Sequence, residues 1–308
     1  MKYLTLLDCV GNTPLIELKN IEKQFNLPFK LFAKLERNNP SGSVKDRTAL
    51  YIVKNGLEAG KINQDSTIIE ATSGNTGISL CMIASALGLK TTIVMPENVS
   101  IERRKIMKAY GANLILTPKT LGMKGSKEKA DEISKNTPNS FLAHQFENES
   151  NIEAHYSGTG IEILRDLDNK VDVFISGFGT GGTLSGVSKR LKETLKNVET
   201  IGVEPKNSPL LTEGKTGPHK IQGIGANFIP NNLLTQYVDR FIDVGDDEAY
   251  EGSRILASKE GIFAGISSGA ALMAAMSLDK EFYKGKNVVI ILPDNGERYL
   301  SVEGLYEQ

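Results

Sequence analysis

The chain has 308 residues, which is enough for two domains or one large α/β unit. Its 36 Lys and Arg balance 37 Asp and Glu, so no excess of positive charge is available for nucleic acid or an anionic membrane. The two cysteines, Cys9 and Cys81, form no CxxC motif, and no apolar stretch approaches the roughly 20 residues that cross a bilayer, so we expect a cytoplasmic protein without disulfides or structural zinc.

Short β-branched runs alternate with segments of helical spacing along the chain. The predicted strands lie in "STIIEATSGNTG", "KTTIVMPEN", "ANLILTP", "VDVFISGFGTGG", "ETIGVEP" and "NVVIILPDNGE", and the predicted helices span 78–87, 101–110, 124–135, 184–195 and 247–260. Strands that alternate with helices predict parallel sheets covered by helices on both faces. The predicted fold class is therefore α/β, with ligands gathered at the carboxyl ends of the strands.

The first feature in chain order is "NNPSGSVKDR", residues 38–47, which places Lys45 after a run of small, turn-forming residues. On its own, Lys45 would be interpreted as a solvated residue that opens a helix. A turn that holds one amine in a fixed place is also what covalent catalysis by lysine requires.

The loop "ATSGNTG", residues 71–77, follows the strand that begins at Thr67. Its glycines, its backbone N–H groups and the side chains of Ser73, Asn75 and Thr76 can converge on a small anion such as a carboxylate. An ordinary helix N-cap formed by Thr72 or Ser73 explains the same residues, and both interpretations stay open.

A second glycine-rich junction is "SGFGTGGTLSG", residues 176–186, where backbone amides and the hydroxyls of Thr180 and Thr183 can hold a phosphate. The same glycines match the dinucleotide pattern GxGxxG, and Glu204 stands where an acid could bind a ribose. A nicotinamide oxidoreductase is thus an alternative. It leaves Lys45 and the loop 71–77 unexplained.

The segment "GISSGA", residues 265–270, contains the GxSxG pattern of the hydrolase nucleophile elbow. In such hydrolases the histidine follows the serine, whereas His144, His155 and His219 all precede Ser267. A hydrolase is therefore excluded, and the serines are predicted to cap a helix or to donate a hydrogen bond to a ligand.

These features together match the needs of one cofactor, pyridoxal 5′-phosphate. It requires a lysine for its aldehyde, a cradle for its phosphate, a site for the carboxylate of its amino-acid substrate and a partner for its ring nitrogen. A single ligand accounts for four features, so we predict a pyridoxal phosphate enzyme without a bound metal.

The chain also resembles the cysteine synthase (O-acetylserine sulfhydrylase) family of fold type II pyridoxal phosphate enzymes over essentially its whole length. Seven motifs carry the resemblance in order: "GNTPL" (11–15), "NPSGSVKDR" (39–47), "EATSGNTG" (70–77), "GTGGT" (179–183), "PHKIQGIG" (218–225), "GISSGA" (265–270) and "GERYLS" (296–301). "NNPSGSVKDR" and "EGIF" (260–263) resemble the B type of these enzymes, and "GTGGT" and "PHKIQGIG", which lie closer to the predicted site and carry more weight, resemble the A type.

The resemblance implies a role for each site residue. Lys45 is the catalytic lysine that binds the cofactor, Asn75 contacts its phenolic oxygen, and Ser267 rather than Ser268 meets its ring nitrogen. The phosphate would rest on Gly179, Thr180, Gly181, Gly182 and Thr183. The substrate would contact Thr72, Ser73, Asn75, Thr76, Gln145, Gly225 and Asn227, the last of which stands where many cysteine synthases have glycine.

The resemblance further implies conversion of O-acetyl-L-serine and sulfide to L-cysteine and acetate through an aminoacrylate. Related enzymes act on L-cysteine or L-serine with water or a thiol, and a silent binding protein on the same fold is a further alternative. Also implied are a homodimer, binding of the C-terminal tail of serine acetyltransferase, and two lobes, with residues 38–147 as the smaller mobile lobe and residues 1–37 plus 148–308 as the larger one.

Overall fold

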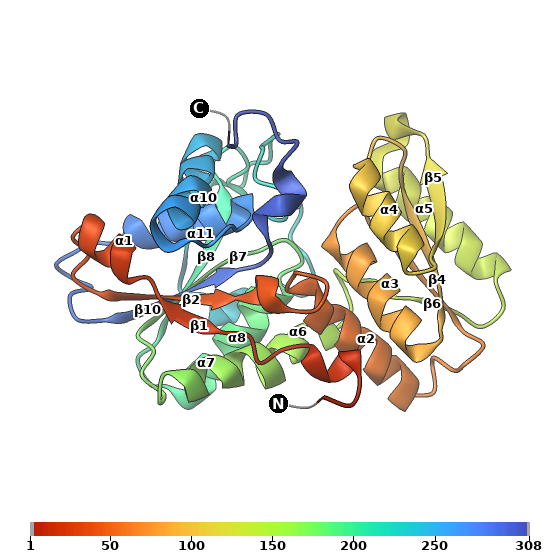
Figure 1. Ribbon diagram of the computed structural model, residues 1–308, viewed down its shortest axis with the longest axis horizontal. Helices are drawn as coiled ribbons and strands as arrows, with labels where there is room; N and C mark the ends of the chain where they lie inside the picture. The colour runs from red at the N-terminus through yellow and green to blue at the C-terminus, as the bar shows by residue number, and fades with distance from the viewer. Residues whose placement is uncertain (1–2, 307–308) are drawn as a thin grey trace. The chain divides into compact units, whose positions relative to one another are not determined.

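The computed structural model describes residues 3–306. The chain folds into two compact units, each with its own sheet (Figure 1). The first unit comprises the chain up to Val10 together with Asn39–Asn151, and the second comprises Gly11–Asn38 and the chain from Ile152 onward. The predicted lobe boundaries near 38 and 147, and the mobility of the smaller lobe, stay predictions.

The first unit is built on a four-stranded parallel sheet in the order β5-β4-β3-β6. Ile68 and Ile69 are neighbours on β3 and are both fully buried, Ile68 in the cluster that contains Ile52 and Leu80, and Ile69 in the cluster that contains Ala130. Because successive strand residues face opposite sides, helices cover both faces of this sheet. The elements are β3 (Thr67–Ala71), β4 (Lys90–Pro96), β5 (Asn113–Thr117), β6 (Ser140–Leu142), α2 (Lys45–Glu58), α3 (Asn75–Leu87), α4 (Ile101–Ala109) and α5 (Gly122–Asn136).

The second unit contains a six-stranded sheet in the order β1-β2-β10-β7-β8-β9, in which only β1 is antiparallel to its neighbour. On β7, Phe174 packs with Val187 and Leu191 of α8, and Ile175 belongs to the cluster that contains Leu256 and Ala270 of α10 and α11. The strands are β1 (Leu15–Glu17), β2 (Lys30–Leu35), β7 (Val173–Gly177), β8 (Glu199–Pro205), β9 (Arg240–Val244) and β10 (Asn287–Leu292).

The helices of the second unit include one π-helix, η4 (His155–Thr159), between α6 and α7. The α-helices are α1 (Lys19–Gln24), α7 (Gly160–Asp166), α8 (Gly182–Thr194), α9 (Leu210–Glu213), α10 (Asp246–Glu260) and α11 (Ile266–Met276), while α6 (Ser150–Ala154) carries the chain from one unit to the other. Within residues 3–306, no helix combines the length and apolarity that a membrane crossing needs.

The structure confirms the α/β prediction and all six predicted strands, and it adds β1, β2, β6 and β9. Strand β2 escaped prediction because Lys34 interrupts its apolar pattern. The Lys34 side chain is fully buried, and its Nζ lies 2.9 Å from Glu162 Oε2 and 3.3 Å from Asp166 Oδ2 and donates to the Thr13 carbonyl at 2.7 Å. A buried charge that is paired and hydrogen-bonded is compatible with a core strand.

Candidate functional site

Lys45 is the first residue of α2 and is half-buried. The turn before it is closed by a 2.8 Å hydrogen bond from Gly42 N–H to the Asn39 carbonyl, and Gly42 has a φ of 86°, which glycine adopts without strain. The fully buried Asp46 accepts from Ser41 N–H at 2.6 Å and from the Ser41 hydroxyl. Asp46 therefore fixes the turn that presents Lys45.

Asp46 also ties α2 to the next predicted site element, because its Oδ1 accepts from the Ser79 hydroxyl of α3 at 2.5 Å. Helix α3 begins at Asn75, within the predicted carboxylate loop. Lys45 and the loop 71–77 are thus held on two helices that share a buried carboxylate. Sequence reasoning had given Asp46 no role, although its position beside Lys45 in "SVKDR" could have pointed to it.

The loop 71–77 leads from β3 into α3 and keeps its backbone in place with local hydrogen bonds. Thr72 N–H donates to the Val94 carbonyl at 3.0 Å, and Gly74 N–H donates to Thr72 Oγ1 at 3.3 Å. A Cβ at Gly77 would lie 2.7 Å from the Met107 methyl carbon, so glycine is needed there for packing. The alternative of an ordinary N-cap formed by Thr72 or Ser73 is contradicted, because the N-cap residue is Gly74 and no side chain accepts a cap hydrogen bond there.

Gln145 lies 69 positions after Thr76 in the sequence, and the structure places the two side chains in contact. The Thr76 hydroxyl donates to Gln145 Oε1 at 2.5 Å, and both residues are buried. The Gln145 carbonyl accepts from Asn151 Nδ2 at 2.9 Å, and Asn151 Oδ1 accepts from the Thr48 hydroxyl of α2 at 2.9 Å. Gln145 and Thr76, two of the predicted substrate residues, therefore belong to one hydrogen-bonded group.

Glu70 is a buried acid at the end of β3 that sequence reasoning assigned to no role. Its Oε2 accepts from His144 N–H at 2.9 Å, and Gln145 lies close to the same carboxylate. Burial raises the pKa of Glu70 to about 7, although the hydrogen bonds from Gln145 and His144 act in the opposite direction. The signal in the sequence was an acid at the end of a β-branched strand, next to the loop.

In the second unit, the loop 177–181 ends at the N-terminus of α8, where Gly181 has a φ of 85°. A Cβ at Gly181 would lie 2.7 Å from Leu233 N, and a Cβ at Gly179 would overlap the Gly223 carbonyl oxygen. Backbone N–H groups at such a helix N-terminus, with no side chain over them, form an anion site. Thr180 is buried, and Thr183 lies in the first turn of the helix.

Thr183 has a partner that the sequence did not reveal. His155 Nε2 lies 3.2 Å from Thr183 Oγ1, and His155 Nδ1 lies 2.9 Å from Thr159 Oγ1, with the imidazole fully buried in the π-helix. π-Helical turns concentrate at functional sites. The histidine fixes the Thr183 side chain in the predicted phosphate loop, a role that the 28 positions between them conceal in the sequence.

The segment "GISSGA" forms the start of α11, with Gly265 as its N-cap. Ser267 and Ser268 are both buried, and the Ser268 hydroxyl has no hydrogen-bond partner within the described chain. A Cβ at Gly223 would lie 3.8 Å from Ser267 Oγ, so Ser267 lies on the side of α11 that faces the 223–225 loop. The structure therefore leaves both hydroxyls as candidates for a ligand.

Gly225 and Asn227 both adopt left-handed backbone conformations, with φ values of 67° and 61°. Glycine, asparagine and aspartate tolerate this conformation best, so asparagine is compatible with the backbone at position 227. Asn227 Oδ1 accepts from the buried Ser208 hydroxyl at 2.7 Å, and His219 Nε2 donates to the Gly225 carbonyl at 3.0 Å. The backbone and these two hydrogen bonds fix the loop.

Glu204, the acid of the nicotinamide alternative, has a structural role. Its carboxylate accepts from Leu211 N–H at 2.8 Å and from Thr212 N–H at 2.9 Å, and thereby caps α9. The geometry gives the ribose interpretation no support.

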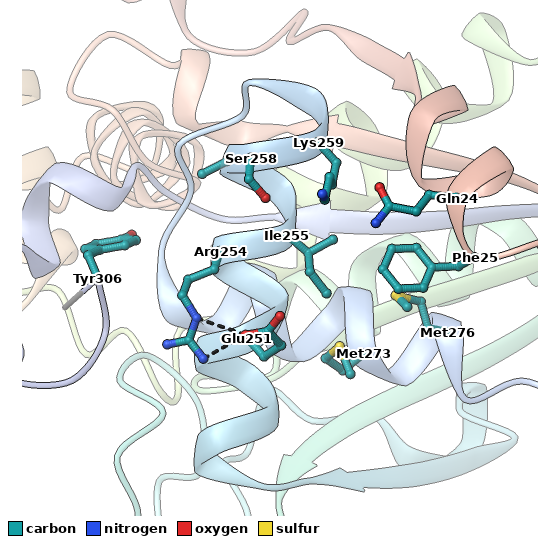
Figure 2. Close-up of a pocket in the computed structure, with 11 residues that line it drawn as sticks. Gln24, Phe25, Glu251, Arg254, Ile255, Ser258, Lys259, Met273, Met276 and Tyr306 are labelled. Atoms are coloured by element: carbon teal, nitrogen blue, oxygen red, sulfur yellow. Dashed lines mark hydrogen bonds and ion pairs between the residues drawn. The ribbon is translucent and has the colours of Figure 1, made fainter. Parts of the chain in front are cut away.

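A groove of about 830 Å³ lies on the second unit between α1, α10 and α11, and it contains none of the predicted site residues (Figure 2). Phe25, Met273 and Met276 line it together with an ion pair in which Arg254 Nη2 lies 2.8 Å from Glu251 Oε2. Met273 and Met276 lie toward the end of α11 opposite to Ser267, so this groove is separate from the 177–181 loop.

Residues 6–294 match the family described as "Pyridoxal-phosphate dependent enzyme". The chain belongs to this family. It is 54% identical over 296 residues to a protein of Campylobacter jejuni named cysteine synthase B, with 96% of each chain covered. The name of this relative is that of the B type, which "NNPSGSVKDR" and "EGIF" also resemble, while the preference for the A type stays a prediction.

Two solved structures show the same fold. The cysteine synthase of Entamoeba histolytica has a TM-score of 0.96 and 42% identity and covers 99% of this chain and 91% of its own. A hydrogen sulfide-producing enzyme of Fusobacterium nucleatum has a TM-score of 0.92 and 47% identity, and the match covers 97% of this chain and 100% of that enzyme. The predictions of a pyridoxal phosphate enzyme and of the fold type II architecture are confirmed.

The residues fit the cofactor that this family uses. A lysine stands on a fixed turn, a helix N-terminus has only glycine at positions 179 and 181, and the buried Ser267 hydroxyl faces the 223–225 loop. An amine, an anion cradle and a neutral hydroxyl are the donor set that pyridoxal phosphate requires.

Proposed function

We propose that the protein is a cysteine synthase, which converts O-acetyl-L-serine and sulfide to L-cysteine and acetate. The observation that carries this proposal is the full-length similarity to relatives named cysteine synthase, at 54% and 50% identity. The hydrogen-bonded group around Gln145 and Thr76 supports it further, because a buried cluster of donors suits the carboxylate of an amino-acid substrate.

Lys45 is proposed to hold the cofactor through its Nζ and, when neutral, to accept the proton from the substrate Cα. When bound, pyridoxal phosphate withdraws electrons from that carbon. The substrate would thereby lose its Cα proton to Lys45 and acetate from Cβ; HS⁻ would then add to Cβ, and Lys45 would return the proton to Cα, which leaves L-cysteine and acetate. Asp46 contributes by holding the turn that orients the amine.

The other roles follow the two glycine-rich junctions. We propose that Gly179, Thr180, Gly181, Gly182 and Thr183 bind the phosphate, with His155 holding the Thr183 hydroxyl. Asn75 is proposed to contact the phenolic oxygen and Ser267 the ring nitrogen. A hydroxyl beside the ring nitrogen, unlike a carboxylate, does not keep it protonated, and this favours prompt loss of the Cβ substituent.

The substrate is proposed to contact Thr72, Ser73, Asn75, Thr76 and Gln145 through its carboxylate. Gly225 and Asn227 would face its side chain. The Asn227 amide oxygen accepts a hydrogen bond from the Ser208 hydroxyl, which holds the Asn227 side chain in one orientation. A fixed orientation suits a residue that selects among leaving groups.

A second candidate is release of sulfide from L-cysteine, or the use of L-serine, through the same residues. The observation that favours it is the 47% identity to the hydrogen sulfide-producing enzyme of Fusobacterium nucleatum. Lanthionine or cystathionine would form if an amino-acid thiol, rather than water or sulfide, added to Cβ.

The test uses the purified protein loaded with pyridoxal phosphate. We expect an absorbance band of the lysine-bound cofactor that is lost in Lys45→Ala. O-Acetylserine, L-serine and L-cysteine are then supplied separately, the first two with sulfide and L-cysteine alone, and the products are measured. Rapid L-cysteine formation from O-acetylserine supports cysteine synthase, whereas turnover of L-cysteine alone without that activity would replace it with the second candidate.

We also propose a homodimer in the cytoplasm that binds the C-terminal tail of serine acetyltransferase. The dimer would have twice the chain mass of 33.5 kDa in light scattering. A peptide with the sequence of that tail should compete with O-acetylserine, and the absence of competition would contradict the partner.

A further inference from the structure

We propose that Arg103 is a positioning residue for substrate. By fixing the peptide between Ser73 and Gly74, it keeps a neighbouring hydroxyl, that of Thr72, available as a donor to the substrate carboxylate. This inference rests on the proposed function, in which Thr72 contacts that carboxylate. All four residues belong to the first unit.

Arg103 joins helix α4 to the tip of the loop 71–77. Its Nη1 donates to the Ser73 carbonyl at 3.1 Å, and its side chain is half-buried. One turn further along α4, the fully buried Met107 packs against Gly77, where a Cβ would lie 2.7 Å from the Met107 methyl carbon. A hydrogen bond donated by a guanidinium is about twice as strong as one between neutral groups. Helix α4 therefore holds the loop with a charged donor as well as with an apolar contact.

The peptide between Ser73 and Gly74 is hydrogen-bonded on both sides. Its carbonyl accepts from Arg103, and its N–H, which belongs to Gly74, donates to Thr72 Oγ1 at 3.3 Å. The C=O and N–H of a trans peptide point in opposite directions, so the arginine sets the direction of both. Packing does not set it, because a Cβ at Gly74 would meet no atom of the described chain within 4 Å.

A flip of this peptide would change what the Thr72 hydroxyl can do. Gly74 permits such a flip, since glycine tolerates the positive φ that it requires. A hydroxyl has one proton to donate and two lone pairs that accept. In the observed orientation Thr72 Oγ1 accepts from the N–H, so this contact leaves its proton for an anion. In the flipped orientation the Ser73 carbonyl would lie beside the hydroxyl and take that proton.

A purely electrostatic role for the arginine makes a different prediction. Arg104 is the next residue of α4 and is also half-buried, but its Nε and Nη2 donate to the Val99 carbonyl at 3.0 and 2.8 Å rather than to the loop 71–77. If positive charge on α4 attracts the carboxylate, loss of either arginine should weaken binding to a similar extent. If the direction of the peptide matters, only the loss of Arg103 should do so.

The experiment titrates the holoenzyme with L-alanine, which has no leaving group at Cβ, and with L-alaninamide, which has no carboxylate. Binding is followed by the change in cofactor absorbance. In Arg103→Gln we expect the affinity for L-alanine to fall about tenfold or more. That for L-alaninamide should fall less than about threefold, because a neutral carbonyl gains less from a donor than a carboxylate does. For O-acetylserine, KM should rise while kcat stays unchanged, because Arg103 does not touch the reacting atoms.

Arg104→Gln is the matched control, since it removes the same charge from the neighbouring position of the same helix. It should lower thermal stability without a change in the ratio of the two affinities. Arg103→Lys keeps the charge and a donor and should restore most of the affinity for L-alanine. If Arg103→Gln does not fold, Arg103→Lys should still show a smaller loss in the same ratio, because an ammonium lacks the planar fork of the guanidinium.

A double-mutant cycle tests whether Arg103 acts through the Thr72 hydroxyl. Thr72→Val removes this hydroxyl and should itself weaken the binding of L-alanine. Adding Arg103→Gln to Thr72→Val should then weaken it by less than about a further twofold, since the two residues act as one unit.

An unchanged affinity ratio in both Arg103 variants, an equal loss in Arg104→Gln, or losses that multiply in the double variant would each overturn the inference. Failure of the proposed function is a different result, in which the wild-type holoenzyme itself shows no absorbance change with either ligand.

Discussion

At the scale of single residues, the site depends on side chains that hold other side chains. Asp46 fixes the turn before Lys45, His155 fixes Thr183, and Glu70 fixes the backbone at His144. Each of these three supporting residues is buried and hydrogen-bonded. Buried polar residues of this kind make a site rigid enough to orient its ligand.

The two serines of "GISSGA" make separable predictions. Ser267→Asp should sharply reduce β-replacement, because a carboxylate would keep the ring nitrogen protonated. Ser268→Ala should be neutral or stabilising by up to about 2 kcal/mol, since its buried hydroxyl has no protein partner in the part of the chain that is described. Turnover with O-acetylserine and the thermal midpoint measure the two effects. Loss of turnover in Ser268→Ala together with full turnover in Ser267→Ala would mean that Ser268, and not Ser267, meets the ring nitrogen.

Glu70 also predicts a pH dependence of stability. Its pKa is raised from the ordinary 4.5 to about 7, so the folded protein binds a proton more tightly than the unfolded chain does. The stability from this proton is fully present below pH 4.5 and is lost as the pH rises through 7, by on the order of 3 kcal/mol. Glu70→Gln should remove this loss. Urea unfolding at pH 5 and pH 8 measures the free energy of unfolding of the wild type and of Glu70→Gln. The same change with pH in both proteins would refute the prediction.

At the scale of elements, function concentrates where a strand passes into a helix. The loop 71–77 joins β3 to α3, and the loop 177–181 joins β7 to α8. In a parallel sheet all such junctions after the strands open at one edge, and each supplies a helix N-terminus with unpaired N–H groups. This geometry explains why both glycine-rich motifs follow predicted strands.

Gly181→Ala tests the junction before α8. The φ of 85° and the backbone atoms of Asn232 and Leu233 at 2.8 and 2.7 Å leave no space for a methyl group. We expect a loss of stability of at least about 2 kcal/mol and weaker binding of pyridoxal phosphate. Gly285→Ala, with a φ of 76° and open surroundings, is the control and should cost about 1 kcal/mol without affecting the cofactor. Equal effects in both variants would mean that only backbone strain matters.

At the scale of the whole molecule, the cofactor is expected to contribute to stability. A ligand that binds only the folded state at 100 times its Kd adds about 2.7 kcal/mol. Removal of pyridoxal phosphate should therefore lower the thermal midpoint of the wild type, and Lys45→Ala should show a smaller decrease because it retains only the noncovalent contacts. Calorimetry of both proteins with and without cofactor provides the measurement. A thermal midpoint that is the same with and without pyridoxal phosphate would contradict binding of the cofactor to the folded chain.

Much of the fold and part of the site could be predicted from sequence because they depend on local patterns. β-Branched runs predicted six strands, including β3 and β7, since a strand buried on both faces must be apolar throughout. Strand β2 was not predicted because Lys34 owes its place to Glu162 and Asp166, which are more than 120 positions away.

The sequence by itself determined the fold class, the family and the motifs that are proposed to hold the cofactor, because glycines, small hydroxyl residues and a lysine in fixed spacing record local backbone requirements. Only the tertiary structure decided which residues hold those motifs in place. The contacts of Gln145 with Thr76, of His144 with Glu70 and of His155 with Thr183 join residues 28 to 74 positions apart. Such pairs form only when the chain folds and buries their polar groups together, since burial requires each of them to find a partner.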